Sequence, residues 1–247
     1  MQTIDLKKIL KTGITITSSG TTGQPKKIFQ SPRKIRFANK IALDVQRITK
    51  KSKILTVCKL DHAGGLLAQT LPAISIGANV TVKKFNSFSF FNEINYYTHT
   101  HLTPTHCKIL MKTKNFKKFK FSKTIITCGS EPVTWDIIES FIDRNCIFIC
   151  NWGMTEIGPI TINYTFNNLD EVSNLKKRSI DQMTIMGNQF YCNWKIIDNE
   201  LIVKSDQCVY KNWFNTGDLV SLNAHNELYY NKKYFKNIDL VLNKNLA

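Results

Sequence analysis

Long hydrophobic stretches are missing from this sequence: no apolar run approaches the ~18–20 residues that a membrane-spanning helix requires. The N-terminus, from Met1 to Lys8, also lacks the apolar core of a secretory signal. Hydrophobic residues nevertheless make up 43% of the chain and charged residues 21%, a balance typical of a folded globular protein. The sequence therefore predicts a cytoplasmic protein without a membrane span.

Paired cysteines are missing as well. The seven cysteines include no C-x-x-C pair, their number is odd, and most have apolar neighbours, as Cys150 does after residues 147–149. This pattern argues against a disulfide framework and against a zinc site. We expect reduced thiols that are buried as small hydrophobic side chains.

Acidic residues are scarce, with 18 Asp and Glu against 34 Lys and Arg, so the formal net charge is +16. Such a charge raises the hypothesis of a nucleic-acid partner. The excess is mainly lysine, is spread along the chain and accompanies many Asn and Ile residues, which is typical of a strongly AT-biased genome. The local cluster at residues 112–120 is more typical of an exposed linker or helix end. We do not expect nucleic acid as the partner.

Strand-like and helix-like segments alternate from residue 14 to residue 150. The expected strands are 14–17, 53–58, 79–82, 124–128 and 146–150, and residues 101–104 are expected to be short and extended. The expected helices are 33–50, 65–76, 88–97, 105–111 and 133–144. This alternation predicts an α/β fold, a mostly parallel sheet with flanking helices.

Short alternating strands follow after residue 170, at 189–194, 195–197, 200–204 and 219–222, with a tight turn at Asp198-Asn199. They predict a small C-terminal antiparallel β subdomain. We therefore expect an α/β core over residues 1–170 and a β-rich subdomain over residues 171–247.

A loop rich in glycine and hydroxyl residues follows the first expected strand, over residues 17–26. Gly20 and Gly23 can take positive φ and bring backbone N–H groups close to an anion, and Lys26 adds a mobile positive charge. The hydroxyl donors are Ser18, Ser19, Thr21 and Thr22. The spacing of a Walker loop is absent. A phosphate site and an ordinary surface loop both fit this composition.

The order of residues in this loop resembles the phosphate loop of the adenylate-forming superfamily, which includes acyl-CoA synthetases, peptide-synthetase adenylation domains and luciferases. That pattern is [ST]-S-G-[ST]-T-G-x-P-K. Four further stretches resemble motifs of the same family in the same order: LDHAGG at 60–65, CGSEP at 128–132, NWGMTE at 151–156 and WFNTGD at 213–218. Trp152 stands where tyrosine is usual. The chain is most similar to acyl-CoA ligases of the o-succinylbenzoate type.

The resemblance implies ATP or AMP and Mg²⁺ as cofactors. It implies that Lys26 and the loop hold the β- and γ-phosphates, that Thr155 donates to the α-phosphate, and that Glu156 binds Mg²⁺. The loop residues concerned are Ser18, Ser19, Gly20, Thr21, Thr22 and Gly23.

The resemblance also places the nucleoside and the acid. Asp218 would accept the ribose hydroxyls, and Lys232 or Lys233 would replace the usual ribose-contacting arginine. His62 would border the acyl carboxylate or gate its tunnel. The residues implied to contact adenine are Gly129, Ser130, Glu131, Pro132, Asn151, Trp152 and Gly153, with the Trp152 ring as a stacking face.

Each of these residues also has a purely structural interpretation. Glu156 could cap a helix or pair with a lysine, and Asp218 could be a turn residue. Trp152 could belong to the core, and His62 could be a loop histidine. The histidines His99, His101 and His106 are close in sequence, but the family binds no metal there, so we expect structural roles for them.

Two parts that the family usually carries have no counterpart in the sequence. Only a short lead-in precedes the loop, so we expect one of the family's usual paired α/β subdomains to be largely missing. We also expect the usual mobile C-terminal domain to be absent. Its catalytic lysine could come from a separate chain. The missing subdomain predicts an exposed apolar face, and hence a homodimer or another partner.

The implied activity is ATP-dependent conversion of a small acyl or aryl acid to an acyl-adenylate. Transfer to a thiol would follow, with CoA or the phosphopantetheine of a carrier protein as acceptor. The alternative is a non-catalytic module that binds a nucleotide or an acyl-adenylate, or one half of a split ligase.

Overall fold

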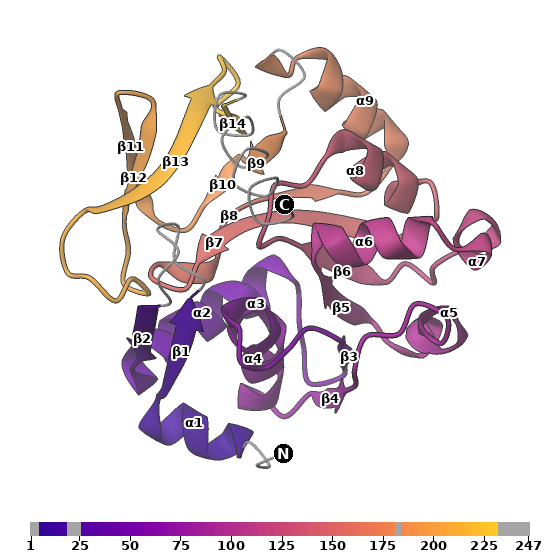
Figure 1. Cartoon of the computed structure of the whole chain (residues 1–247), viewed down its shortest axis with the longest axis horizontal. Coiled ribbons are helices and arrows are strands. Elements are labelled where there is room, and N and C mark those ends of the chain that lie inside the picture. The colour runs from indigo at the N-terminus through magenta and orange to yellow at the C-terminus, as the bar shows by residue number, and fades with distance from the viewer. Residues whose placement is uncertain (1–4, 19–25, 181–183, 232–247) are drawn as a thin grey trace, which may run out of the picture.

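A computed structural model describes residues 5–18, 26–180 and 184–231 of the chain (Figure 1). The first described helix, α1 (Leu6–Thr12), begins at Asp5, whose carboxylate accepts a hydrogen bond from the backbone N–H of Lys8 at 3.0 Å. A two-stranded antiparallel hairpin follows, formed by β1 (Ile14–Ser18) and β2 (Lys26–Gln30). The predicted first strand is therefore confirmed, and it is paired with the segment that follows the glycine-rich loop.

The main sheet has seven strands in the order β10-β8-β7-β6-β5-β3-β4. The strands are β3 (Lys53–Thr56), β4 (Asn79–Val82), β5 (His99–Leu102), β6 (Ile125–Cys128), β7 (Ile147–Met154), β8 (Gly158–Phe166) and β10 (Gln189–Phe190). Neighbours from β4 to β7 pair in parallel, whereas β8 and β10 pair antiparallel. The predicted mostly parallel sheet is confirmed.

Helices cover both faces of this sheet (Figure 1). One group is α2 (Pro32–Val45), α3 (Ala63–Gly65), a π-helical segment (Leu66–Thr70) and α4 (Leu71–Ser75). The other group is α5 (Phe90–Glu93), a 3₁₀ segment (Ile94–Tyr96), α6 (Pro104–Met111), α7 (Lys114–Lys118), α8 (Trp135–Ile142) and α9 (Leu169–Lys177). The second group packs on the largest apolar cluster of the described residues, which contains Phe141 and Phe148.

The second large sheet is antiparallel throughout, with the order β11-β12-β13-β14-β9. Its strands are β9 (Ile185–Gly187), β11 (Asn193–Ile197), β12 (Glu200–Lys204), β13 (Phe214–Leu222) and β14 (Leu228–Tyr230). Asp198 and Asn199 have φ of 51° and 65°, which confirms the predicted tight turn between β11 and β12. The predicted antiparallel subdomain is confirmed, while its boundary at residue 170 stays a prediction.

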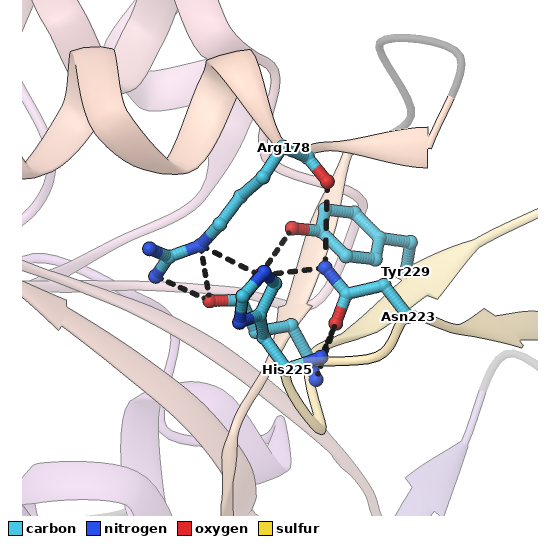
Figure 2. Close-up of polar contacts among 5 residues, drawn as sticks. Arg178, Asn223, His225 and Tyr229 are labelled. Atoms are coloured by element: carbon cyan, nitrogen blue, oxygen red, sulfur yellow. Dashed lines mark hydrogen bonds and ion pairs between the residues drawn. The ribbon is translucent and has the colours of Figure 1, made fainter.

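An ion pair with a buried carboxylate connects the end of α9 to this second sheet (Figure 2). The Arg178 guanidinium donates to Glu227 at 2.6 and 2.9 Å, and the Glu227 side chain is 1% exposed. Asn223 and Tyr229 also donate to Glu227, at 2.7 and 2.9 Å. Burial alone would raise the pKa of this carboxyl, but these donors together lower it below its usual range. The second sheet is thus fixed to the end of α9 by a carboxylate with several hydrogen-bond donors.

Two expectations about the region after residue 150 are wrong. The predicted strand at 146–150 continues to Met154, so Trp152 and Gly153 lie in β7 and not in a loop beyond its end. The cause is β8, which pairs with β7 from Phe148↔Phe166 to Met154↔Gly158 and supplies backbone partners for the extension. The strand predicted at 189–194 is divided between the two sheets, because Gln189 and Phe190 form β10 of the main sheet and β11 of the second sheet begins at Asn193. The polar stretch after residue 167 forms helix α9, which begins at the capping residue Asn168.

No helix within the described ranges is long and apolar enough to cross a membrane. All seven cysteines are free, and six of them are buried, as the sequence predicts.

Candidate nucleotide site

The motif segments gather where β6 and β7 end and where the β1–β2 hairpin approaches them (Figure 1). Gln30, at the end of β2, donates from its side-chain amide to the backbone carbonyl of Thr155 at 2.6 Å. Gln30 is buried, and 125 residues separate the two partners. This bond holds the strand that leaves the glycine-rich loop against the turn that carries Thr155 and Glu156.

A second long-range bond joins two other motifs. The indole N–H of Trp152 donates to a carboxylate oxygen of Asp218 at 2.8 Å across 66 residues of sequence. Trp152 lies in β7 and Asp218 in β13, so the bond connects the main sheet to the second sheet. The Trp152 ring is 4% exposed and packs in a cluster that includes Ile157 and Met186. The ring is thus part of the apolar core between the sheets, and it also orients the Asp218 carboxylate.

Glu156 lies in the turn between β7 and β8 and is 7% exposed. Its backbone carbonyl accepts from the N–H of Val209 at 2.8 Å, which fixes the turn against the loop between β12 and β13. Within the described part of the chain, its carboxylate has no hydrogen-bond or ion-pair partner. A buried carboxylate that has no partner among the described residues fits the oxygen ligand that Mg²⁺ prefers.

The end of β6 packs tightly on β7 and on the segment that opens α3. A Cβ on Gly129 would lie 2.5 Å from the backbone oxygen of Asn151, so only glycine allows this approach. Asn151 donates to the Pro159 carbonyl at 2.6 Å, and its side-chain oxygen is buried without a partner among the residues described. Ser130 is exposed and has φ of 76°, a strained value for a residue other than glycine. Strain of this kind is concentrated at functional sites.

The remaining expected site residues have less defined surroundings. Lys26 begins β2 and is exposed, and Glu131 is exposed, with the Thr105 hydroxyl 3.4 Å from its carboxylate. Pro132 is half-buried. His62 does not reach the other motifs: its side chain is 61% exposed and faces Asp61 at 3.6 Å. Ser18 ends β1, whereas Ser19, Gly20, Thr21, Thr22, Gly23 and Lys232 lie outside the described residues.

The described histidines do not come together in a shared metal centre. His99 contacts the carbonyl oxygen of Gln46 at 2.8 Å, and the His106 ring stacks on Phe85 with centroids 4.2 Å apart. Among the residues that the structure describes, no group of three His, Cys, Asp or Glu side chains could hold a metal ion.

Sequence analysis missed a polar layer between the sheet and the π-helical segment. Gln46, which caps the end of α2, is fully buried and accepts from both Gln69 and Thr127 at 2.9 Å. Thr56 and Thr70 form a hydroxyl pair at 2.8 Å in the same layer. Gln30 was missed too, because a single glutamine carries no pattern. The polar residues Thr56, His101 and Thr127 were visible as interruptions of apolar strands.

Fold and motif arrangement together define the large domain of an adenylate-forming protein. The chain belongs to the AMP-binding enzyme family, whose sequence profile matches residues 14–205. Over 147 residues it is 31% identical to an indoleacetate–CoA ligase from Aromatoleum aromaticum, an alignment that covers 58% of this chain and 29% of the ligase. It is also 28% identical over 149 residues to a nonribosomal peptide synthetase from Penicillium fellutanum, with 58% of this chain and 6% of the synthetase covered.

Solved structures share the fold. The N-terminal domain of FACL13 from Mycobacterium tuberculosis superposes with a TM-score of 0.74 at 15% identity, covering 88% of this chain and 59% of that one. The o-succinylbenzoate coenzyme A synthetase from Bacillus subtilis, in complex with ATP and a magnesium ion, gives 0.71 at 21% identity, with 87% and 49% covered. The chain thus spans less than two thirds of the length of each of these proteins and of both sequence relatives.

Proposed function

We propose that this chain activates a small carboxylic acid with ATP. The acid's carboxylate attacks the α-phosphorus of ATP, the bond to the β-phosphate oxygen breaks, and acyl-adenylate and pyrophosphate result. The acyl group then passes to a thiol, with CoA or a carrier phosphopantetheine as acceptor and AMP as leaving group. The observation that carries the proposal is the pair of bonds, Gln30 to Thr155 and Trp152 to Asp218, which brings three motif segments together.

Phosphoryl chemistry of this kind needs positioning and neutralised charge more than covalent catalysis. In this proposal the hairpin of β1 and β2 presents its loop and Lys26 to the β- and γ-phosphates. Thr155 donates to the α-phosphate, and Glu156 holds Mg²⁺, which screens the phosphate charge. The hydrogen bond from the Gln30 side chain holds the hairpin and the turn that carries Thr155 and Glu156 in a fixed position relative to each other.

The nucleoside is assigned to the other side of the β7–β8 turn. Asp218, oriented by the Trp152 indole, accepts the ribose hydroxyls. Residues 129–132 and 151–153 border the adenine, with the strained Ser130 at the exposed edge. The Trp152 face that sequence analysis assigns to adenine stacking is largely covered by core residues, so in this proposal its contact is confined to the ring edge.

The acid is proposed to be acyl or aryl. Support comes from the similarity to an indoleacetate–CoA ligase and to an o-succinylbenzoate coenzyme A synthetase. A carrier protein, a separate chain that supplies the lysine of the C-terminal domain, and a homodimer remain proposals about partners.

The test is ATP–pyrophosphate exchange with a panel of short, medium and aryl acids, comparing the unaltered chain with Glu156→Gln. We expect exchange that requires an acid and falls ~10²–10³-fold in the variant, because a group that stabilises transition-state charge is lost. Glu139→Gln is the matched control, since Glu139 is an exposed carboxylate paired with Lys176 on the far helices.

Calorimetric titration with ATP and Mg²⁺ separates the alternatives. Nucleotide binding without exchange would support a non-catalytic nucleotide-binding module or half of a split ligase. Absence of both exchange and nucleotide binding would overturn both functions.

A further inference from the structure

The segment from α6 to the start of β6 is rich in lysine and contains no acidic residue. Between Glu93 and Glu131 the sequence has no Asp or Glu, and seven exposed lysines lie in this stretch: Lys108, Lys112, Lys114, Lys117, Lys118, Lys120 and Lys123. None of the seven forms an ion pair with any other residue that the structure describes. Like charges at this density repel one another, so the segment is suited to an anionic partner.

The backbone of this lysine-rich segment is held by buried aromatic side chains. Phe116 on α7 and Phe121 after it are 3% and 1% exposed, and their ring centroids lie 5.1 and 5.8 Å from that of Phe141. Residues 112–120, interpreted from the sequence as an exposed linker or helix end, therefore include a helix with a buried aromatic residue. The lysines are thus held at fixed places on the outer surface of the molecule.

Exposed apolar side chains accompany the lysines. Phe88 and Tyr96 are 78% and 75% exposed and lie at the two ends of the stretch that forms α5 and the 3₁₀ segment. Ile109 is 41% exposed and lies on α6 between Lys108 and Lys112. Large apolar side chains that gather on an exposed surface indicate an interaction site.

Hydrogen bonds connect the stretch that carries Tyr96 to the lysine-rich segment. The Asn95 side chain donates to the backbone carbonyl of Lys120 and accepts from the backbone N–H of Ser122, both at 3.0 Å. Tyr96 therefore lies beside the lysines that follow α7.

A ring contact connects the stretch before Phe88 to α6. The Phe85 ring stacks on that of His106 with centroids 4.2 Å apart. Since α5, α6 and α7 also lie on one side of the main sheet (Figure 1), their exposed residues share one surface. We call this surface, made by the seven lysines with Phe88, Tyr96 and Ile109, the basic–apolar patch.

Acidic side chains on the adjoining segments do not neutralise the basic–apolar patch. Glu93 on α5 pairs with Lys83, and Asp143 after α8 pairs with Arg144. Each carboxylate already has a cation outside the patch, so neither compensates one of its seven lysines.

The patch combines the two features that bind a protein to the surface of an anionic bilayer. Clustered lysines are attracted to anionic lipid headgroups without a fixed geometry, and exposed apolar side chains enter the boundary between headgroups and acyl chains. A nucleic acid fits less well. Arginine, which binds phosphates in a bidentate geometry, is absent from residues 94–130, and the aliphatic side chain of Ile109 cannot stack on a base.

We propose that the basic–apolar patch attaches this protein to the surface of an anionic lipid bilayer. The lysines contact the headgroups, and Phe88, Tyr96 and Ile109 enter the interface. Tyr96 precedes β5 and Lys123 precedes β6, so this end of the patch lies at the amino ends of the strands, whereas the candidate nucleotide site lies at the carboxyl ends of β6 and β7. The proposal does not depend on the proposed acid activation.

Co-sedimentation with lipid vesicles measures the binding. One set of vesicles is phosphatidylcholine alone, and the other is an equal mixture of phosphatidylcholine and phosphatidylglycerol. We expect partitioning to the mixed vesicles to be at least ~100-fold stronger and to weaken as salt is added. The triple variant Lys114→Ser, Lys117→Ser, Lys118→Ser should bind the mixed vesicles ~100-fold more weakly, because each lysine near an anionic surface contributes about five-fold.

The matched control removes the same charge elsewhere. Lys40→Ser, Lys204→Ser, Lys211→Ser changes exposed lysines on α2, at the end of β12 and before β13. This variant should lose less than ~5-fold, because salt screens charges that lie farther than about 10 Å from the bilayer. Equal losses in the two triple variants, or equal partitioning to neutral and mixed vesicles, would overturn the proposal. Binding of single-stranded polyuridine that the first triple variant loses, without binding to vesicles, would also overturn it and indicate a nucleic acid.

A second measurement tests the apolar part of the patch. Phe88→Trp places an indole at the expected interface, and Ile197→Trp, at a 45% exposed position on β11 of the second sheet, is the matched control. With mixed vesicles whose acyl chains are brominated, we expect stronger fluorescence quenching in Phe88→Trp than in the unaltered chain, whose four tryptophans give the background. Ile197→Trp should show no added quenching. Equal added quenching in the two variants, or none in either, would overturn the proposal, because the patch would then not face the bilayer.

Discussion

The two faces of the seven-stranded sheet are made from alternate residues of the same strands, yet their chemistry differs. One face carries Leu55, Leu102, Ile126 and Phe148, which join the largest apolar cluster of the described residues. The other face mixes apolar and polar residues, because Ile54 is in register with His99 and Ile149 is in register with Thr127. The polar row is Thr56, His101 and Thr127, three residues in register across three strands.

The difference shows that the apolar face stabilises the fold, whereas the polar face contributes less. Close packing of large side chains stabilises the first face, whereas each buried polar group on the second face must find a partner to be neutral. The row lies toward the carboxyl ends of parallel strands, where ligands of α/β proteins bind. The helix that covers these polar residues is a π-helical segment, a form often found at functional sites.

The apolar face should show the largest loss of stability on truncation. Phe148→Ala, at a side chain that is 0% exposed and whose ring centroid lies 5.6 Å from that of Phe141, is expected to lower the free energy of unfolding by ~3–5 kcal/mol. Urea denaturation followed by circular dichroism measures it. Phe88→Ala is the matched control, because Phe88 is 78% exposed and its loss should change stability by less than ~0.5 kcal/mol. Equal effects of the two variants would contradict the assignment of the core to this face.

The polar face should be sensitive where its groups are paired. Gln46→Leu leaves Gln69, Thr127 and the Ala68 carbonyl without the partner that Gln46 provides at 2.7–2.9 Å. We expect a loss of ~2–3 kcal/mol in the free energy of unfolding, because buried groups become unsatisfied. The exposed Gln189→Leu is the control in the same denaturation experiment. A loss below ~0.5 kcal/mol would mean that water replaces Gln46 and that the layer is not dry.

Sequence was sufficient for the parallel strands and for the motifs, because apolar strands and glycine-rich loops are local patterns. The strand β8 was not predicted, although Ile160, Ile162 and Tyr164 alternate with polar residues, which is a strand signal in its own right. Its pairing with β7, which draws Trp152 into the sheet, depends on contacts that no local pattern specifies.

Side-chain contacts between distant segments are the part of the candidate site that sequence could not supply. The bonds from Gln30 to Thr155 and from Trp152 to Asp218 span 125 and 66 residues. Nothing in the spacing of these residues predicts that they meet. For the same reason, the three neighbouring histidines could not be told apart in sequence, whereas in the structure only His101 is left without a partner among the described residues.

The smallest change in stability is expected on substitution of His101, which lies on the polar face and has no hydrogen-bond partner among the described residues. His101→Leu should change the free energy of unfolding at pH 7 by less than ~1 kcal/mol, because an apolar side chain replaces a ring that makes no hydrogen bond to the described residues. The variant should differ more clearly from the unaltered chain in how its free energy of unfolding depends on pH.

The sign follows from the pKa of His101, which falls from 6.5 in the unfolded chain to about 4 in the folded protein. Between these values only the unfolded chain binds the proton, so stability decreases as the pH falls, by ~1.4 kcal/mol per pH unit. Urea unfolding at pH 7 and pH 5 should therefore show a decrease that is ~2 kcal/mol smaller in His101→Leu, with His99 and His106 left to account for the remainder. Equal decreases in the two proteins would mean that the ring reaches water, and the polar row would then be a wet surface and not a buried layer.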